Sequence, residues 1–475
     1  MADPHYLKYT LGPLEIETST PVFKLMPNLS TERWKLNLLT CSAQRELIAV
    51  ASGRIIYFIS APTLGKLPDK PSRLFALEYS YPCASTINSL QCFSKSGEEF
   101  VIATCEDGCF VRIYIDDLKT GQTFQIATES LWGFDYQSAS DQFIVSSNTH
   151  MAYLGKFVDN GHQIIHNLKG HQDNIPCVAF SKLNSSLIAS AGIDRHLRMW
   201  YGHKLVHSIG PSHNFCWSCG FIPRSEIQST IVGLEYNNIV VKTLLPQHHF
   251  SDEPYPLSLN INYFYGVDDG EYDFETETEY DDALNLIEAE PQLLHIESTQ
   301  DESQNQTEAV DSTESDSSSN FPPVDFTGDE IYYVVTSQDI SFYSFVQSIP
   351  LMTVNSALLA SVKPDQRSLY HNQFVDWSFD RFTYSIWSSE LSCLFLANQM
   401  GFTIIIHVFY NAEHHLEKCL LALPEGYSKT APLAGIALKR VDASSPNYFN
   451  LYLLHIDGSF RIYLIRRQIT SNKTN

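Results

Sequence analysis

Short runs in which apolar and polar residues alternate recur along most of the chain, and they are rich in β-branched and aromatic side chains. The runs come in groups of three separated by turn residues, as in INSLQCFS, EFVIATCED and CFVRIYID over 87–116. Alternation with a period of two residues is typical of short β-strands. Many short strands at regular spacing, with a recurring motif in each group, favour an all-β propeller over a sandwich.

The number of groups predicts the number of blades. Seven groups are complete, at 34–60, 87–116, 131–158, 168–202, 216–245, 381–409 and 432–467. A further strand pair at 331–346 would raise the total from seven blades to eight if it formed a blade of its own. The N-terminal strands at 20–26 are expected to join the last group, because closing the ring removes exposed sheet edges.

These groups divide the chain into three parts. We expect an N-terminal part of the propeller with about five blades over 1–250, and a C-terminal part over 331–475 that closes the ring. An acidic low-complexity insert over 251–330 separates them and is expected to leave the ring between two blades.

The negative charge is concentrated in and around this insert. No Lys or Arg occurs between Lys242 and Lys363, whereas this interval holds 24 of the 54 Asp and Glu residues. The rest of the chain has 30 acidic residues (54 − 24) against 31 basic ones, so the net charge of −23 belongs to one segment. A near-neutral propeller lacks the basic surface of a protein that binds DNA or RNA directly.

The insert itself is predicted to be disordered, because a segment with few apolar residues and strong like charge cannot bury enough surface to offset its ordering entropy. Two interpretations stay open: a solvated spacer, or a recruitment arm for partners. Its hydroxyl-rich stretch at 312–319 lies among acidic residues and is a candidate for phosphorylation, which phosphopeptide mapping would test.

The clearest group is the fourth, which reads LKGHQDNIPCVAFSKLNSSLIASAGIDRHLRMWYG over 168–202. It resembles one WD repeat, the unit of a propeller blade. The resemblance implies a buried hydrogen-bond network formed by His171, Ser190, Asp194 and Trp200. Tyr201 departs from the repeat, which usually has Asp at that position.

His171 and Asp194 could also be interpreted as an acid–base pair, but the strand pattern around them favours a structural network that holds the blade together. The loops of this blade are then the better candidates for binding a partner, because exposed loop residues that do not pack in the core carry recognition more often than strands do. The candidate partner-binding residues are Gln172, Asp173, Asn174, Arg195 and His196.

Other signals for chemistry are weak. Cys216 and Cys219 have CxxC spacing, but a zinc site needs two more ligands, so we interpret them as residues of a core strand. The paired histidines at 248–249 and 414–415 have no converging partners in the sequence and are expected on the surface. We therefore predict no catalytic residue, no metal, no cofactor and no enzymatic activity.

The remaining composition favours a protein inside the cell. The ten cysteines are scattered through predicted strands, the N-terminus has no apolar signal segment, and no apolar stretch is long enough to span a membrane. We expect a cytoplasmic or nuclear protein that does not associate with membranes.

Several motifs go beyond the general repeat. They are Trp132-Gly133, the run SSNTH at 146–150, Gly170-His171 with NIP at 174–176, and Cys216-Trp217. In this order they resemble the fungal WD-repeat family named for constitutive ribonucleotide reductase transcription. The resemblance implies a non-enzymatic adaptor that regulates ribonucleotide reductase genes, and hence nucleotide supply, through transcriptional regulators as protein partners.

Two alternatives remain. The first is a substrate receptor that binds cullin ligase subunits, although the stretch at 200–203 lacks both the Asp and the Arg of the Trp-Asp-x-Arg element common in such receptors. The second is a general assembly scaffold, which only the frequency of propellers in that role supports.

Overall fold

The computed structural model describes a large part of the chain, and all structural statements below concern these residues. The described residues are 9–11, 14–19, 23–32, 35–61, 75–159, 161–212, 214–229, 329–337, 339–345, 347–354, 382–398, 401–423, 432–441 and 447–467. The predicted disordered insert falls almost wholly outside them, so its disorder stays a prediction.

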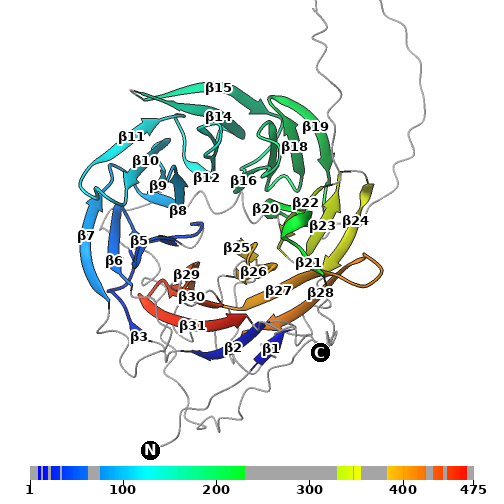
Figure 1. Ribbon diagram of the computed structural model, residues 1–475. Helices are drawn as coiled ribbons and strands as arrows, with labels where there is room; N and C mark the ends of the chain where they lie inside the picture. Colours follow the sequence, from blue (N-terminus) through cyan, green and yellow to red (C-terminus); the bar gives the residue numbers. More distant parts are fainter. Residues whose placement is uncertain are drawn as a thin grey trace, which may run out of the picture. The chain divides into compact units, whose positions relative to one another are not determined.

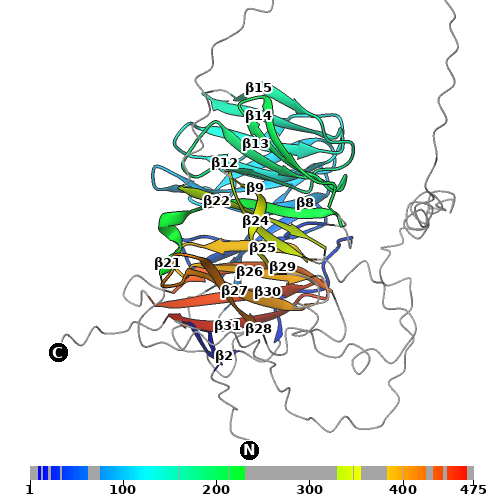
Figure 2. The ribbon, with the colours of Figure 1, turned by 90° about the vertical axis from the view of Figure 1, so that its right-hand side faces the viewer.

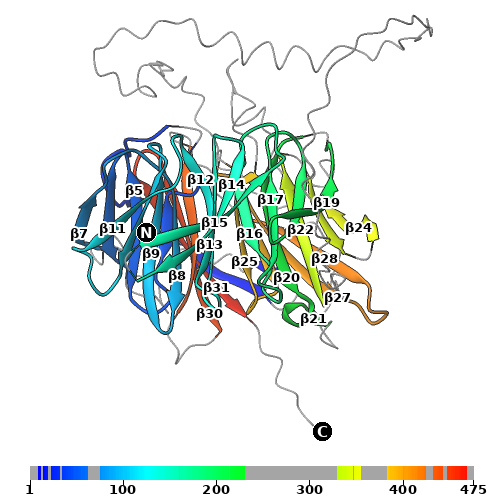
Figure 3. The same cartoon turned by 90° about the horizontal axis from the view of Figure 1, so that it is seen from above.

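The described strands form seven sheets around a central axis, antiparallel except for one short pair in blade 6, which confirms the predicted all-β propeller with seven blades (Figure 1). Figures 2 and 3 show the same ring from its sides; in Figure 3 the strands run between two opposite faces that carry the turns.

The first three blades each have four consecutive strands. Blade 1 is β4 (Leu39–Cys41), β5 (Leu47–Ser52), β6 (Ile55–Ser60) and β7 (Ala76–Pro82). Blade 2 is β8 (Ile87–Lys95), β9 (Glu98–Cys105), β10 (Cys109–Tyr114) and β11 (Gly121–Gln125). Blade 3 is β12 (Leu131–Gln137), β13 (Gln142–Ser147), β14 (Met151–Val158) and β15 (Gly161–Lys169).

The next two blades follow the same order from the inside of the ring to its rim. Blade 4 is β16 (Cys177–Phe180), β17 (Leu187–Ala191), β18 (Leu197–Tyr201) and β19 (Lys204–Ile209). Blade 5 is β20 (Cys216–Pro223), β22 (Glu330–Thr336), β23 (Ile340–Ser344) and β24 (Gln347–Val354), with a 3-10 turn η2 (Arg224–Glu226) after β20.

The last two blades contain strands from distant parts of the chain. Blade 6 is β25 (Phe382–Ser388), β26 (Cys393–Asn398), β27 (Thr403–Tyr410) and β28 (Leu416–Ala422), and β21 (Gln228–Ser229) pairs with β27. Blade 7 is β29 (Leu433–Arg440), β30 (Tyr448–His455), β31 (Ser459–Arg467) and β2 (Leu14–Ser19), with β1 (Tyr9–Leu11) beside β2 and β3 (Phe23–Lys24) beside β31.

Blade 5 corrects two expectations. Its first strand β20 pairs directly with β22, in a register that runs from Cys216↔Thr336 to Pro223↔Glu330. The strand pair expected at 331–346 therefore belongs to the fifth blade, and the interval 230–328 falls between strands of this blade in the chain rather than between two blades. The prediction of further blade 5 strands over 229–245 is wrong at its start, because Ser229 pairs in parallel with Tyr410 of blade 6; the rest of that range lies outside the described residues.

The ring closes through the N-terminal strands, as expected. β2 pairs with β31, and the short β3 pairs with the beginning of β31. Leu14 and Ile16 of β2 are buried, with 0% and 2% of their surface exposed. Glu15 between them accepts a hydrogen bond of 2.7 Å from Arg466. The main closing strand thus lies at 14–19, before the expected stretch at 20–26. Within the described residues 23–26 of that stretch, Phe23 and Lys24 form a strand.

Buried carboxylates join neighbouring blades at equivalent positions. Glu99 of blade 2 accepts hydrogen bonds from the Ser42 hydroxyl and from the backbone of blade 1. Glu330 of blade 5 does the same with the Ser181 hydroxyl and the Lys182 backbone N–H of blade 4. Because these groups are buried and paired, they help to fix the positions of adjacent blades, in addition to the apolar contacts.

His407 on β27 provides a test of the core through pH. Its side chain is fully buried, and its ring stacks on Phe409 with centroids 5.4 Å apart. Burial lowers the pKa of His407 from 6.5 to about 4, and the positive charge of Arg467 acts in the same direction. Between these two pH values the unfolded chain binds more protons than the folded one. The contribution of the neutral His407 to stability is therefore complete above pH 6.5 and is lost as the pH falls towards 4.

We expect His407→Leu to reduce the loss of unfolding free energy between pH 7 and pH 5 by about 2 kcal/mol. Urea unfolding at both pH values measures this change. His415→Leu is the control, because the side chain of His415 is 72% exposed. Equal pH dependence in the native protein and His407→Leu would contradict the prediction.

Candidate functional site

Two loops of blade 4 lie on the same face of the ring. The first, 170–174, leads from β15 into β16, and the second, 192–196, connects β17 to β18. We call this the upper face: it carries the segments that enter the first strand of each blade and the turns between second and third strands. Position 192 accepts only glycine, because a Cβ atom would collide with Asp194 and with the ring of His171. Arg195 has a φ of 65°, which closes the second loop tightly.

The structure brings the four residues of the expected network together between these loops. His171 Nδ1 lies 3.0 Å from Asp194 Oδ1, and His171 Nε2 lies 2.7 Å from Ser190 Oγ. Trp200 donates its indole N–H to Ser190 Oγ over 2.8 Å. We assign the tautomer with the proton on Nδ1, since Trp200 then donates to Ser190, Ser190 to His171 Nε2, and His171 to Asp194. His171 Nδ1 also lies 2.6 Å from the guanidinium of Arg198.

Arg198 is a fifth member that the sequence analysis did not include. Its guanidinium donates to Asp194 Oδ2 over 2.6 Å, and the residue is only 8% exposed. The available signal was a basic residue inside a buried strand, two positions before Trp200, since a charge at an inward position needs a partner. Asp194 also accepts from the backbone N–H groups of Gln172 and His196, at 3.1 Å and 3.2 Å.

The charges of this network are fixed at neutral pH. Burial raises the pKa of Asp194, but the hydrogen bonds from His171, Gln172 and Arg198 outweigh it and hold the pKa well below its usual range. Burial lowers the pKa of His171, although Asp194 opposes this effect. A neutral imidazole thus lies beside an ionised carboxylate. The side chain of His171 is 0% exposed and both ring nitrogens are occupied, so the pair offers no proton to a substrate in solvent.

The five candidate partner-binding residues lie around this network and differ in exposure. Gln172 and Arg195 are exposed, whereas Asp173, Asn174 and His196 are half-buried. The backbone of Asn174 accepts from Ile193 over 2.9 Å, and His196 Nδ1 lies 2.8 Å from the carbonyl oxygen of Asp194. Asp194 therefore links the two loops and fixes the positions from which Gln172 and Arg195 project.

The same face carries two tryptophans, one in blade 3 and one in blade 5, on either side of blade 4. Trp132 at the start of β12 donates its indole N–H to Asn148 in the turn before β14, and Trp217 in β20 donates to Ser337 Oγ over 2.9 Å. The strand register is irregular at both positions. Bulges of this kind change the direction of a side chain, and they are frequent near binding sites. Trp132 is half-buried and lies on the upper face, in the blade next to blade 4.

Cys216 and Cys219 lie in β20 and are 2% and 4% exposed, as expected for a core strand. All ten cysteines are unpaired. His414 and His415 are exposed in the turn between β27 and β28, whereas His248 and His249 lie outside the described residues. Among the described residues, no group of three or more His, Cys, Asp and Glu side chains is arranged to hold a metal ion.

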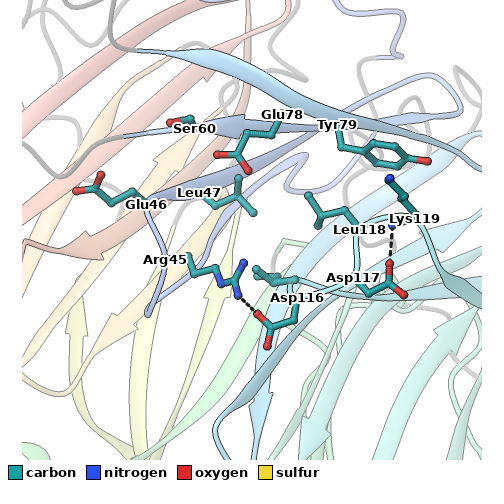
Figure 4. Close-up of a pocket in the computed structure, with 11 residues that line it drawn as sticks. Arg45, Glu46, Leu47, Ser60, Glu78, Tyr79, Asp116, Asp117, Leu118 and Lys119 are labelled. Atoms are coloured by element: carbon teal, nitrogen blue, oxygen red, sulfur yellow. Dashed lines mark hydrogen bonds and ion pairs between the residues drawn. The ribbon is translucent and has the colours of Figure 1, made fainter.

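A cavity of about 630 Å³ lies on the opposite side of the blades, between blades 1 and 2 (Figure 4). Figure 4 shows Leu47 and Leu118 on its walls and an ion pair from Arg45 to Asp116 that joins the two blades. The side chains of Arg45 and Asp116 are 55% and 65% exposed. Because its charged groups are solvated, this recess lacks the preorganised polar groups of a catalytic site.

No helical segment in the described part of the chain has the length and apolar character of a membrane span.

Comparisons with known proteins agree with this architecture. No protein-family model matches the chain. It is 25% identical over 192 residues to an uncharacterized WD repeat-containing protein of Schizosaccharomyces pombe, a match that covers 35% of this chain and 39% of that protein. The fold is similar to a chain in the crystal structure of a mitotic checkpoint complex, with a TM-score of 0.52, 12% sequence identity, and coverage of 94% of this chain and 91% of that one. At this identity the likeness shows the fold alone.

Proposed function

We propose that this protein is an adaptor without catalysis of its own, whose upper-face loops on blade 4 bind a protein partner. The observation that carries the proposal is the position of Gln172 and Arg195, two exposed side chains on loops that the buried Asp194 holds together. A rigid support beneath exposed loop residues reduces the entropy lost on binding. The half-buried Trp132 on the same face adds the kind of residue that dominates interface energies.

We further propose that the partners are transcriptional regulators and that the protein controls ribonucleotide reductase genes in the nucleus or cytoplasm. The support is the order of the four motifs from Trp132-Gly133 to Cys216-Trp217, all of which lie at the upper-face positions described above. The ten unpaired cysteines fit a reducing compartment.

Charge reversal tests the blade 4 loops. We expect the double variant Arg195→Glu, His196→Glu to recover at least about tenfold less of its main partner, because interface charges set partner choice. The tagged intact chain and the variant are purified from cells, and bound proteins are quantified by mass spectrometry. Lys119→Glu reverses an exposed charge beside the cavity between blades 1 and 2 and is the matched control.

Three outcomes distinguish the proposals. Loss of transcriptional regulators in the double variant alone supports both the adaptor function and its specific role. Recovery of cullin and its adaptor subunits instead would support a ligase receptor and contradict the transcriptional role. Unchanged recovery of all partners in the double variant would remove Arg195 and His196 from the binding surface.

A further inference from the structure

Exposed apolar side chains gather on two adjacent blades. Seven large apolar residues are exposed among those the structure describes, and five of them belong to blades 3 and 4, namely Val158, Ile165, Leu183, Leu205 and Val206. Ile165 lies on β15, whereas Leu205 and Val206 lie on β19, the outermost strands of these blades (Figure 1). Scattered apolar residues need no explanation, but a group on neighbouring elements indicates a binding surface.

A strand bulge gives Ile165 and Val206 their exposure. The pairing of β15 passes from Leu154↔His166 to Gly155↔Ile164 and leaves Ile165 without a cross-strand partner. The pairing of β19 likewise passes over Val206. Bulges on an edge strand hinder the addition of another strand. A partner of this surface would therefore contact side chains rather than extend the sheet.

The two outer strands carry no negative charge. Neither β15 nor β19 contains Asp or Glu, and β24 of the next blade contains none either. The exposed or half-buried cationic and imidazole groups here are His162, His166, Lys169, His203, Lys204 and His207. The rings of His166 and His203 lie 4.4 Å apart and connect the two blades. Burial and the neighbouring His203 lower the pKa of His166, so the positive charge of this surface comes from Lys169 and Lys204. The acidic residue Asp159 lies at the far end of the β14–β15 turn.

We propose that the outer strands of blades 3 and 4 bind an extended segment of a partner protein that combines acidic and apolar residues. Its apolar side chains would pack on Ile165, Leu205 and Val206. Its carboxylates would pair with Lys169 and accept hydrogen bonds from the imidazole N–H groups of His166 and His203. Charge complementarity selects this occupant, because a second copy that presented the same surface would place like charges against each other. This proposal specifies the chemistry of one partner and therefore rests on the proposed adaptor function.

Peptide binding to the purified full-length chain tests the proposal. The probe is a fluorescent peptide in which Glu alternates with Leu and Phe, and its affinity is measured by fluorescence anisotropy. We expect the double variant Ile165→Glu, Val206→Glu to bind at least about tenfold more weakly, because it removes apolar contacts and adds repulsion. Leu77→Glu is the matched control, since Leu77 is 60% exposed on β7, the outermost strand of blade 1. We expect its affinity to stay within twofold of the native chain.

Two further probes identify the occupant. A peptide with Gln in place of Glu is expected to bind at least about tenfold more weakly, whereas equal binding would overturn the role of charge. A poly-Glu peptide or anionic lipid vesicles that bind as tightly as the probe would overturn the mixed acidic and apolar segment. Absence of probe binding to the native chain, or equal losses in Leu77→Glu, would overturn the surface itself.

Tighter probe binding by a chain without residues 266–330 would make the chain's own acidic segment the occupant and would overturn the assignment to a partner. Urea unfolding of each variant establishes that it is folded. Because these measurements use no cell extract, their failure leaves the result of the partner recovery experiment unaffected, and the reverse also holds.

Discussion

Trp200→Ala is expected to lower the free energy of unfolding by roughly 3–5 kcal/mol, the usual range for truncating a buried large side chain. Trp200 is 2% exposed and packs between blades 3 and 4 against Ile144, Leu154 and Ile175. The substitution opens a cavity there and removes the N–H group that Ser190 accepts. Urea unfolding followed by far-UV circular dichroism measures the change.

Trp200→Phe separates packing from hydrogen bonding. It keeps most of the apolar volume but removes the indole N–H together with part of the ring system, so we expect a smaller loss of about 1–2 kcal/mol. A loss below about 1 kcal/mol for Trp200→Ala would mean that blade 4 does not depend on this network, and the loops with Gln172 and Arg195 would need another support.

Removal of the closing strand is expected to have the largest effect. A chain without residues 1–19 loses β1 and β2, the two outer strands of blade 7, and exposes the surface that Leu14 and Ile16 cover. Burial of two large apolar side chains contributes about 3–6 kcal/mol, and the hydrogen bonds of the β2–β31 ladder add to it. We expect a loss of about 5 kcal/mol or more, measured as the shift of the urea midpoint.

A chain without residues 1–8 is the control, because this deletion removes none of the described strands. Leu14→Asp with Ile16→Asp tests the same contact without shortening the chain, since two buried carboxylates disfavour docking of β2. Midpoints of both the longer deletion and the double variant within experimental error of the native chain would show that the ring is stable without its closing strand.

The hydrogen-bond network of blade 4 could be predicted in part because its residues lie close together in the sequence. His171, Ser190, Asp194 and Trp200 lie within thirty residues of one another, and a repeat fixes their spacing. Arg198 was missed because its partner Asp194 was already assigned to His171, and the sequence does not show that a carboxylate accepts from several donors at once. The exposure of Gln172 and Arg195 also became known only from the loop conformations.

Apart from the N-terminal strands that close the ring, the outermost strands were not predicted, since each group was expected to contain three strands. Strands such as β7 and β19 pack on one side only, and most of their residues are exposed. Their sequences therefore lack the strict alternation that marks the inner strands. The surface with Ile165 and Val206, which lies on these strands, could not be inferred without the structure.

The sequence by itself determined the strand periodicity, a propeller of seven or eight blades and the joining of its ends, because these follow from local alternation and from the need to remove free sheet edges. Only the tertiary structure decided which strands share a blade. The pairing of Cys216–Pro223 with Glu330–Thr336 spans more than a hundred residues of chain, and buried strands rich in Val, Ile and Tyr fit several partners equally well. Their pairing depends on which edges meet in the closed ring, and that is a property of the whole fold.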